Sequence, residues 1–295
     1  MADFKFFIIP RARTGGTLLA TMLNAHPEIS MCYEIYPDLL LDSGGSAFVP
    51  KELLRRLKIA RRADFESWVK ALGRDNFRVF AARARRSGIE PPALLLALKD
   101  FVKGKRSLDM LDDRLDLIDL LLHGQAKHVG KGYVGGKMRT EPNVLYRRHP
   151  QAVFLMTLRD GRDVLDSRLK VGSFKATPAD CAHEWCDALE TFEGFLRDTG
   201  AKGCLVRYED MVAAPEKLLT PVMALAGLSF DPLMVNFTQV AQPLFKNAHG
   251  HLSAKQLSGG LNSSSIGRWR NGLSSQQVDE FMAIAGDEMR RYGYV

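Results

Sequence analysis

A strand, a glycine-containing loop and a helix are predicted to follow one another near the start of the chain. The apolar run 4–9 predicts a short buried strand, and after the loop 10–17 the apolar residues recur at helical spacing. This order of elements places the free N–H groups of a helix N-terminus, and the positive end of its dipole, against a bound phosphate. Where an ATP-binding P-loop has Gly-Lys-Ser/Thr, this chain has Gly15-Gly16-Thr17, and the cation of the loop is Arg13. The loop therefore predicts a phosphate site that needs no metal ion.

The composition restricts the partners without choosing one. A formal net charge of +7 and a pI of about 9.2 favour a polyanion: a nucleotide, a nucleic acid or an anionic membrane surface. The four cysteines are scattered and show no zinc-site spacing, which favours free thiols in a reducing compartment. The chain has no run of 18 apolar residues and no secretory leader pattern, so we expect a cytoplasmic protein without a transmembrane segment.

Alternation of strand and helix patterns predicts a three-layer α/β fold, with helices on both faces of a central parallel sheet. Strands are expected at 4–9, 29–34, 133–136, 152–158 and 203–207, and helices between them at 142–149, 160–170, 177–198, 210–226 and 274–291. The segment 41–128 has no strand pattern and predicts a helical cap, inserted into a single domain that spans 1–295. Its helices are expected at 51–59, 64–73, 75–86, 90–104 and 108–123.

Three cations stand just after predicted strands: Arg13, Lys137 and Arg159. Ligands of parallel α/β sheets bind beyond the carboxyl ends of the strands, so these side chains are expected to converge on one site. Ser167 follows Arg159 by two helical turns, and an arginine fork with a hydroxyl suits a phosphate monoester. The alternative for Arg159 is a structural salt bridge with a neighbouring aspartate.

Five motifs follow one another along the chain. They are Arg13-Thr14-Gly15-Gly16-Thr17-Leu18-Leu19 with Asn24-Ala25-His26-Pro27, Arg159-Asp160-Gly161-Arg162-Asp163-Val164 with Ser167, Arg207-Tyr208-Glu209-Asp210-Met211, Gly267-Arg268-Trp269-Arg270-Asn271, and Gly293-Tyr294. In this order they resemble the motifs of the PAPS-dependent sulfotransferases, in particular the bacterial and Golgi-type members that carry an arginine in the loop and a glutamate after the second strand. The resemblance covers 4–295 apart from the helical segment.

The resemblance implies a P-loop-like fold and the in-line transfer of a sulfuryl group from PAPS to an acceptor hydroxyl or amine, with PAP as the product and no metal ion. It implies Glu34 as the general base, with Arg13 and Lys137 as the catalytic cations. The residues it assigns to the nucleotide are Arg13, Thr14, Gly15, Gly16, Thr17 and Leu18 at the 5′-phosphosulfate, Arg159 and Ser167 at the 3′-phosphate, Tyr208 near the adenine, and Arg268 and Trp269 closing over the nucleotide.

The sequence departs from the family pattern at three positions and leaves alternatives open. Gly16 replaces a hydroxyl residue, the proline expected two residues after Lys137 comes only at Pro142, and the position four residues after Ser167, basic in some relatives, is Val171. Glu34 has the alternative of a surface carboxylate or a partner of Arg13, and Lys137 that of a surface lysine. We expect a small-molecule, carbohydrate or lipid acceptor that contacts the helical segment, and no nucleic-acid partner. The competing functions are a P-loop kinase, which the missing Gly-Lys-Ser/Thr disfavours, and a non-catalytic PAP- or nucleotide-binding protein.

Overall fold

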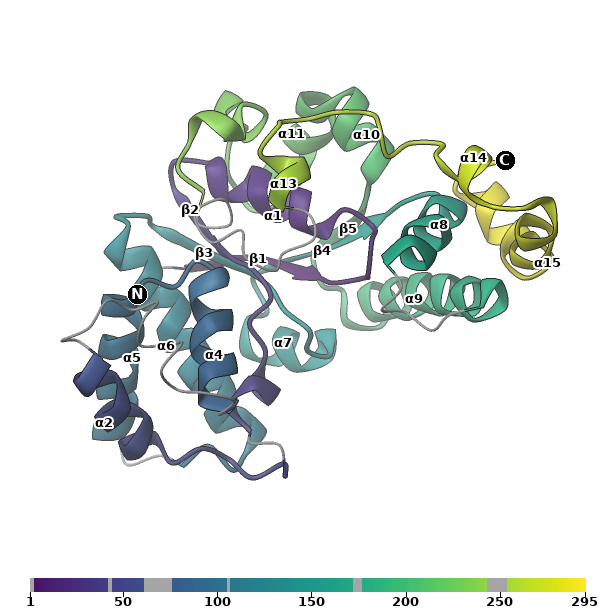
Figure 1. Cartoon of the computed structure of the whole chain (residues 1–295). Coiled ribbons are helices and arrows are strands. Elements are labelled where there is room, and N and C mark those ends of the chain that lie inside the picture. Colours follow the sequence, from purple (N-terminus) through teal and green to yellow (C-terminus); the bar gives the residue numbers. More distant parts are fainter. Residues whose placement is uncertain (1–2, 42–43, 61–75, 105–106, 172–176, 243–253) are drawn as a thin grey trace. The chain divides into compact units, whose positions relative to one another are not determined.

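The computed structural model describes residues 3–41, 44–60, 76–104, 107–171, 177–242 and 254–295 (Figure 1). Its five strands form one sheet in the order β2-β3-β1-β4-β5. The strands are β1 Asp3–Ile9, β2 Ile29–Cys32, β3 Tyr133–Lys137, β4 Val153–Leu158 and β5 Gly203–Arg207. The predicted α/β fold, a central parallel sheet flanked by helices, is confirmed, and all five strands lie where the apolar runs place them.

The chain divides into two compact units. Unit 1 comprises Met1–Phe7, Ala20–Thr140 and Asp231–Ser258, and unit 2 comprises Ile8–Leu19, Glu141–Phe230 and Gly259–Val295. Helix α1, Gly16–Ala25, begins in unit 2 and ends in unit 1.

Unit 1 contains the parallel pair β2 and β3 and the helices of the predicted insertion. Ile29 pairs with Tyr133 and Cys32 with Gly136. The helices are η1 Pro37–Leu40, α2 Pro50–Ala60, α4 Asn76–Arg86, α5 Pro91–Lys103, α6 Leu111–His128, η2 Pro232–Met234, η3 Phe237–Gln239 and α13 Ala254–Leu257. The predicted helix 64–73 lies outside the described residues. Helix α5 packs against α6 and α2 (Figure 1), and the role of this region as a cap stays a prediction.

The connection from α1 to β2 is fixed by a lysine that the sequence did not single out. Lys131 Nζ donates hydrogen bonds to the carbonyl oxygens of Asn24 (2.6 Å), His26 (3.0 Å) and Ile29 (2.8 Å). These include carbonyls at the end of a helix, which have no partner within the helix. His26 itself accepts a hydrogen bond at Nδ1 from the backbone N–H of Glu28 (3.1 Å). The ammonium group of Lys131 thus ties α1 to β2.

Lys131→Met is expected to destabilise the fold in a pH-dependent way. Loss of the three bonds should lower the free energy of unfolding at pH 7 by roughly 1–3 kcal/mol. Burial lowers the pKa of Lys131 from 10.5 to about 8. Between these pH values the unfolded chain binds this proton more fully than the folded chain, so the contribution of Lys131 to the free energy of unfolding rises with pH. Denaturant titrations from pH 7 to 10 should show the gap between wild type and variant widening. Lys127→Met, at an exposed position of α6, should show no such trend. A gap for Lys131→Met that stays constant from pH 7 to 10 would contradict the lowered pKa of Lys131 in the folded protein.

Unit 2 contains the parallel pair β4 and β5, with Phe154 paired to Gly203 and Leu158 to Arg207. Every residue of β4 is buried, as expected of an inner strand. The helices are α7 Pro142–Arg148, α8 Gly161–Val171, α9 Pro178–Thr199, α10 Tyr208–Ala213, α11 Pro215–Leu225, α14 Trp269–Gly272 and α15 Ser275–Arg291. Thr177 caps α9 as predicted, in a capping box with Asp180.

The prediction of one helix over 210–226 is wrong. Ala214 has φ −146° and ψ 61°, so it ends α10 and stands immediately before α11. The residue before a proline is disfavoured in the helical conformation, and Pro215 follows Ala214 directly. The proline is therefore the physical reason for the break.

Two further features bear on function. The four cysteines, Cys32, Cys181, Cys186 and Cys204, are free thiols, as the sequence predicted. In the part of the chain that the structure describes, no helix has the length and apolar character needed to cross a membrane, and no group of His, Cys, Asp and Glu side chains could hold a metal ion.

Candidate active site

The loop between β1 and α1 has a backbone that few residues adopt. Arg13 has φ +67° and Gly15 has φ +100°. A Cβ atom added to Gly15 would lie 2.6 Å from Cδ2 of Tyr208, the first residue of α10. Glycine is needed here for both reasons, because its φ is left-handed and because the loop backbone packs directly on the Tyr208 ring. The resemblance assigned Gly15 and Tyr208 to the nucleotide, and the structure brings these two residues into contact.

Thr14 uses its hydroxyl to fix the loop. Its Oγ1 lies 2.7 Å from Oγ1 of Thr157, in β4, and donates to the carbonyl oxygen of Arg11 at 3.1 Å. The predicted contribution of Thr14 to phosphate binding is therefore left to its backbone N–H. Since β4 is buried, this pair of threonines anchors the loop to the sheet.

Arg13, Ser167 and Arg159 lie together in unit 2. Arg13 Nε donates to Ser167 Oγ at 2.7 Å, and Arg159 Nη1 donates to the carbonyl oxygen of Arg13 at 3.1 Å. The pKa of Arg13 is lowered by burial and, to a smaller extent, by the positive charges of Arg159 and Arg268. A bound anion would relieve both effects, because it would pair with the buried charge and offset the repulsion among the three guanidinium groups.

Arg159 is held on several sides and keeps one donor free. It is 5% exposed, and its guanidinium lies 4.9 Å from the centre of the Tyr208 ring and 3.7 Å from Asp163. Its Nη2 donates to the carbonyl oxygen of Ser265, and its own carbonyl accepts from Trp185 Nε1 at 3.0 Å. Its Nε is buried and has no hydrogen-bond partner among the described residues. A buried donor without a partner is costly, which is expected where a ligand supplies the acceptor.

The motif at 267–271 is attached to helix α8 by two buried aspartates. Asp163 accepts from the backbone N–H of Gly267 (2.8 Å) and of Trp269 (3.0 Å), and Asp166 pairs with Arg268. Burial raises the pKa of Asp163, and the two backbone N–H groups act against that rise. The sequence placed Arg268 and Trp269 at the nucleotide but missed the function of the aspartates.

The Trp269 ring contacts two arginine side chains of unit 2. The guanidinium of Arg162 is 4.0 Å from its centre, and that of Arg270 is 4.9 Å away. The contact with Arg162, a residue of α8, and the aspartate bonds together fix the segment 267–270 against α8. All the residues that the resemblance assigned to the nucleotide belong to unit 2.

The remaining two candidates, Glu34 and Lys137, lie in unit 1 and form an ion pair. Lys137 Nζ is 2.7 Å from Glu34 Oε1, and Lys137 is only 6% exposed. The alternative of a surface lysine is therefore wrong. Strand β2 ends at Cys32, earlier than predicted, and Glu34 follows with φ +43°.

Left-handed backbone marks two of the three predicted catalytic positions. Within the described ranges, Arg13 and Glu34 are the non-glycine residues with positive φ. Such conformations cost free energy, and surrounding contacts must hold them in place. Their coincidence with a predicted cation and a predicted base supports a functional origin for the strain.

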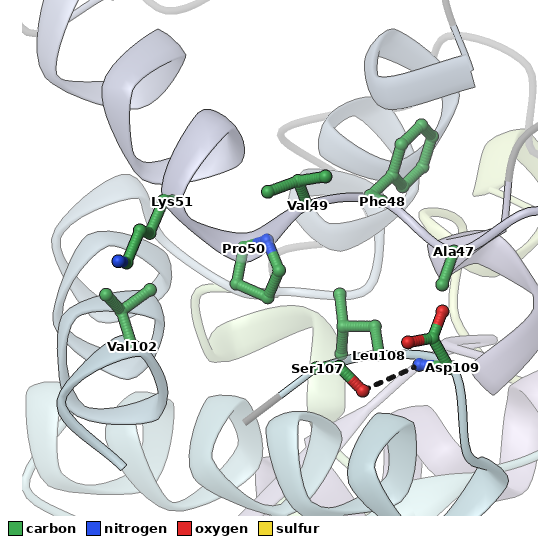
Figure 2. A pocket seen from close by; sticks show the side chains of 9 residues that line it. All are labelled: Ala47, Phe48, Val49, Pro50, Lys51, Val102, Ser107, Leu108 and Asp109. Carbon is green, nitrogen blue, oxygen red and sulfur yellow. Dashed lines mark hydrogen bonds between the residues drawn. The ribbon is translucent and has the colours of Figure 1, made fainter. Parts of the chain in front are cut away.

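A cavity of about 400 Å³ also opens in unit 1 (Figure 2). It lies between the entry to α2, the end of α5 and the segment before α6, and is mostly apolar, with Lys51 and Asp109 as its charged side chains. The nine lining residues are Ala47, Phe48, Val49, Pro50, Lys51, Val102, Ser107, Leu108 and Asp109. None of them is a candidate site residue, so we do not assign this cavity to the chemistry.

Comparison with known proteins agrees with the motifs and the fold. The chain is 24% identical over 237 residues to protein-tyrosine sulfotransferase 2 of Gallus gallus, covering 77% of this chain and 52% of that protein. It is 22% identical over 295 residues to protein-tyrosine sulfotransferase 1 of Danio rerio, covering 96% and 70%. The chain thus spans about half the length of the first relative.

A solved structure shares the fold. The sulfotransferase domain of the Synechococcus PCC 7002 olefin synthase superposes with a TM-score of 0.55 at 17% identity, over 97% of this chain and 96% of that one. At this identity the likeness concerns the fold, and it confirms the predicted P-loop-like architecture. Residues 6–232 match the model of the sulfotransferase family, which is most of the sequence, and the chain therefore belongs to that family.

Proposed function

We propose that the protein transfers a sulfuryl group from PAPS to an acceptor hydroxyl by in-line displacement, with Glu34 as general base. The observation that carries this proposal is the arginine cluster of unit 2, in which Arg13 donates to Ser167 and Arg159 donates to the carbonyl oxygen of Arg13. The cluster has a buried positive charge and an unused donor, Nε of Arg159, so it fits an anionic nucleotide.

The residues of this chain account for the demands of the reaction. PAPS supplies the sulfuryl group, and PAP is the departing product. Glu34 takes the proton of the acceptor hydroxyl. The hydroxyl oxygen forms a bond to the sulfur of PAPS as the bond from that sulfur to the phosphate oxygen of PAP breaks. Arg13 and Lys137 neutralise negative charge that develops on the transferring group and on the departing phosphate oxygen. These cations do what Mg²⁺ does in phosphoryl transfer, and we propose that no metal ion is required.

The acceptor carries a hydroxyl group in this proposal. The two similar proteins above are named for action on protein tyrosine, so a tyrosine hydroxyl joins the small-molecule, carbohydrate and lipid hydroxyls expected from the sequence. Acceptor screens should therefore include tyrosine-containing peptides beside sugars, sterols and phenols.

Calorimetric titration with PAP, with and without EDTA, tests the nucleotide site. We expect binding of about one PAP per chain that EDTA does not change, followed by transfer of label from PAPS to an acceptor in the screen. Absence of PAP binding together with Mg²⁺-dependent binding of ATP would favour the kinase. PAP binding without transfer to any acceptor class would favour the binding protein.

A further inference from the structure

The carboxylate of Glu34 is faced by cations on both of its oxygens. Lys137 lies against Oε1, and two arginines of helix α4 lie near Oε2: Arg83 Nη1 at 3.5 Å and Arg86 Nη2 at 3.8 Å. The arginines are one turn apart on α4, so their side chains lie on the same face of the helix. The side chain of Arg83 is 36% exposed and that of Arg86 is 18% exposed.

The backbone at the end of α4 also holds Tyr33, the residue before Glu34. The carbonyl oxygen of Ser87 accepts from the backbone N–H of Tyr33 at 3.1 Å. Gly88, with φ +92°, ends the helix, and the N–H of Ile89 returns to the carbonyl of Ala84 at 2.9 Å. This Gly-terminated cap fixes where the helix stops, and it stops beside the residue that precedes Glu34.

Tyr33 is held from its other end by a buried polar network. Its hydroxyl donates to Thr21 Oγ1 and lies equally close, 3.3 Å, to Oε1 of Gln242. Gln242 also binds Asn24 Nδ2 at 2.8 Å. With the Tyr33 ring fixed inside unit 1 and its N–H bound to α4, the backbone at Glu34 has little freedom, which explains how a non-glycine residue keeps φ +43°.

We infer that the C-terminal end of α4 belongs to the catalytic centre, with Arg83 and Arg86 as positioning residues that hold the Glu34 carboxylate ionised and oriented. This inference rests on the proposed function of Glu34. It gives the helical segment a part in the reaction beyond contact with an acceptor.

The electrostatics of the group agree with this role. The pKa of Arg86 is lowered by burial and then by the charge of Arg83, and Glu34 acts in the opposite direction. The two arginines repel each other, and the Glu34 carboxylate offsets part of that repulsion. By reciprocity, their charges stabilise the ionised form of Glu34.

Tyr36, another titratable residue of unit 1 whose pKa the Glu34 charge affects, remains neutral at physiological pH. Burial, with a smaller effect of the Glu34 charge, raises the pKa of Tyr36 to about 12. The guanidinium of Arg139 lies 5.7 Å from the centre of the Tyr36 ring. Among the described ion pairs of Glu34 within unit 1, the facing charges are those of Lys137, Arg83 and Arg86.

The experiment compares the double variant Arg83→Gln/Arg86→Gln with Arg85→Gln. Arg85 is on the same helix but pairs with Glu90, so it is a matched control. The first readout is an NMR pH titration of ¹³C-labelled glutamate carboxylates, with the Glu34 signal identified by its absence in Glu34→Gln. Loss of the two positive charges should move the titration of Glu34 to higher pH, while Arg85→Gln leaves it in place.

The second readout is the pH profile of kcat/KM for sulfuryl transfer. The acid limb should move to higher pH in the double variant, which lowers kcat/KM on the acid side by about two- to fivefold, the scale of partly exposed ion pairs. PAP affinity should not change. Arg83→Lys/Arg86→Lys keeps the charges and should restore the wild-type profile.

The outcomes separate the inference from the proposed function. An unchanged Glu34 titration in a folded double variant would overturn the inference, and so would an equal change in Arg85→Gln or in the lysine variant. If the double variant fails to fold, the single variants Arg83→Gln and Arg86→Gln provide the same comparison. A shift in the NMR titration in a protein that transfers no sulfuryl group would support the electrostatic role of α4 while contradicting the proposed function alone.

Discussion

Glu34→Gln is expected to reduce the rate of sulfuryl transfer by about 10²–10⁴-fold, the usual contribution of a general base. The amide has nearly the same size and shape as the carboxylate, but it cannot accept the proton of the acceptor hydroxyl. It also loses the ion pair with Lys137, whose ammonium lies 2.7 Å from Glu34 Oε1. PAP affinity should stay within about twofold of wild type, because the proposal assigns Glu34 to the acceptor hydroxyl and not to the nucleotide.

Initial rates with labelled PAPS and calorimetry with PAP measure the two effects separately. Glu90→Gln is the matched control, since Glu90 also pairs with an arginine of α4 in unit 1. It should retain wild-type turnover. Lys137 is buried and loses its carboxylate partner in Glu34→Gln, so thermal unfolding must show that the variant is folded at the assay temperature. Turnover close to wild type in folded Glu34→Gln would remove Glu34 from the role of base.

Local patterns in the sequence were sufficient for the sheet and most of the helices. Apolar runs bounded by turn residues predicted every strand within a few residues, because the inner strands of a parallel sheet are buried on both faces. The predicted helix 108–123 ends too early. In the structure α6 continues through Gly124 to His128 and packs against α5. A glycine inside a helix costs free energy relative to alanine, but tertiary packing can override that preference, and the sequence alone does not reveal the packing.

The candidate site was predictable where its residues form motifs. Arg13, Arg159 and Ser167 stand at fixed places after strands, and the structure joins them by direct hydrogen bonds. The surroundings of Glu34 were not predictable in this way. The partners Arg83, Arg86 and Lys137 are 49 to 103 residues away in the sequence, and no local spacing links a loop carboxylate to the end of a distant helix.

Asp163 illustrates a different limit of sequence reasoning. It lies inside a motif that was recognised, yet the motif does not say which atom the carboxylate binds. The structure shows that Asp163 accepts two backbone N–H groups of the C-terminal segment, so its function depends on residues more than 100 positions later. A motif can therefore identify a residue correctly and still leave its partner unknown.

Arg159→Ala is expected to weaken PAP binding by about 2 kcal/mol or more, the scale of a lost charge-assisted contact, which corresponds to a roughly 30-fold higher Kd. The side chain is buried, and its charge adds to that of Arg13 in attracting an anion, although the two cations repel each other in its absence. Its removal also frees the carbonyl oxygens of Arg13 and Ser265, so the phosphate loop and the C-terminal segment lose a common anchor.

Calorimetry with PAP measures this effect, with Arg197→Ala as the control, because Arg197 is an exposed arginine of unit 2 that pairs only with a neighbouring surface aspartate among its described contacts. Arg159→Lys keeps the charge but loses the fork, and an intermediate Kd is expected because a lysine makes point contacts in place of bidentate ones. The decisive comparison is with Glu34→Gln. If Arg159→Ala loses PAP affinity while Glu34→Gln keeps it, binding of the nucleotide and transfer of the proton are separate tasks of Arg159 and Glu34. If both variants lose PAP affinity equally, the division of roles between Arg159 and Glu34 is wrong, because a general base that contacts only the acceptor cannot change the affinity for PAP.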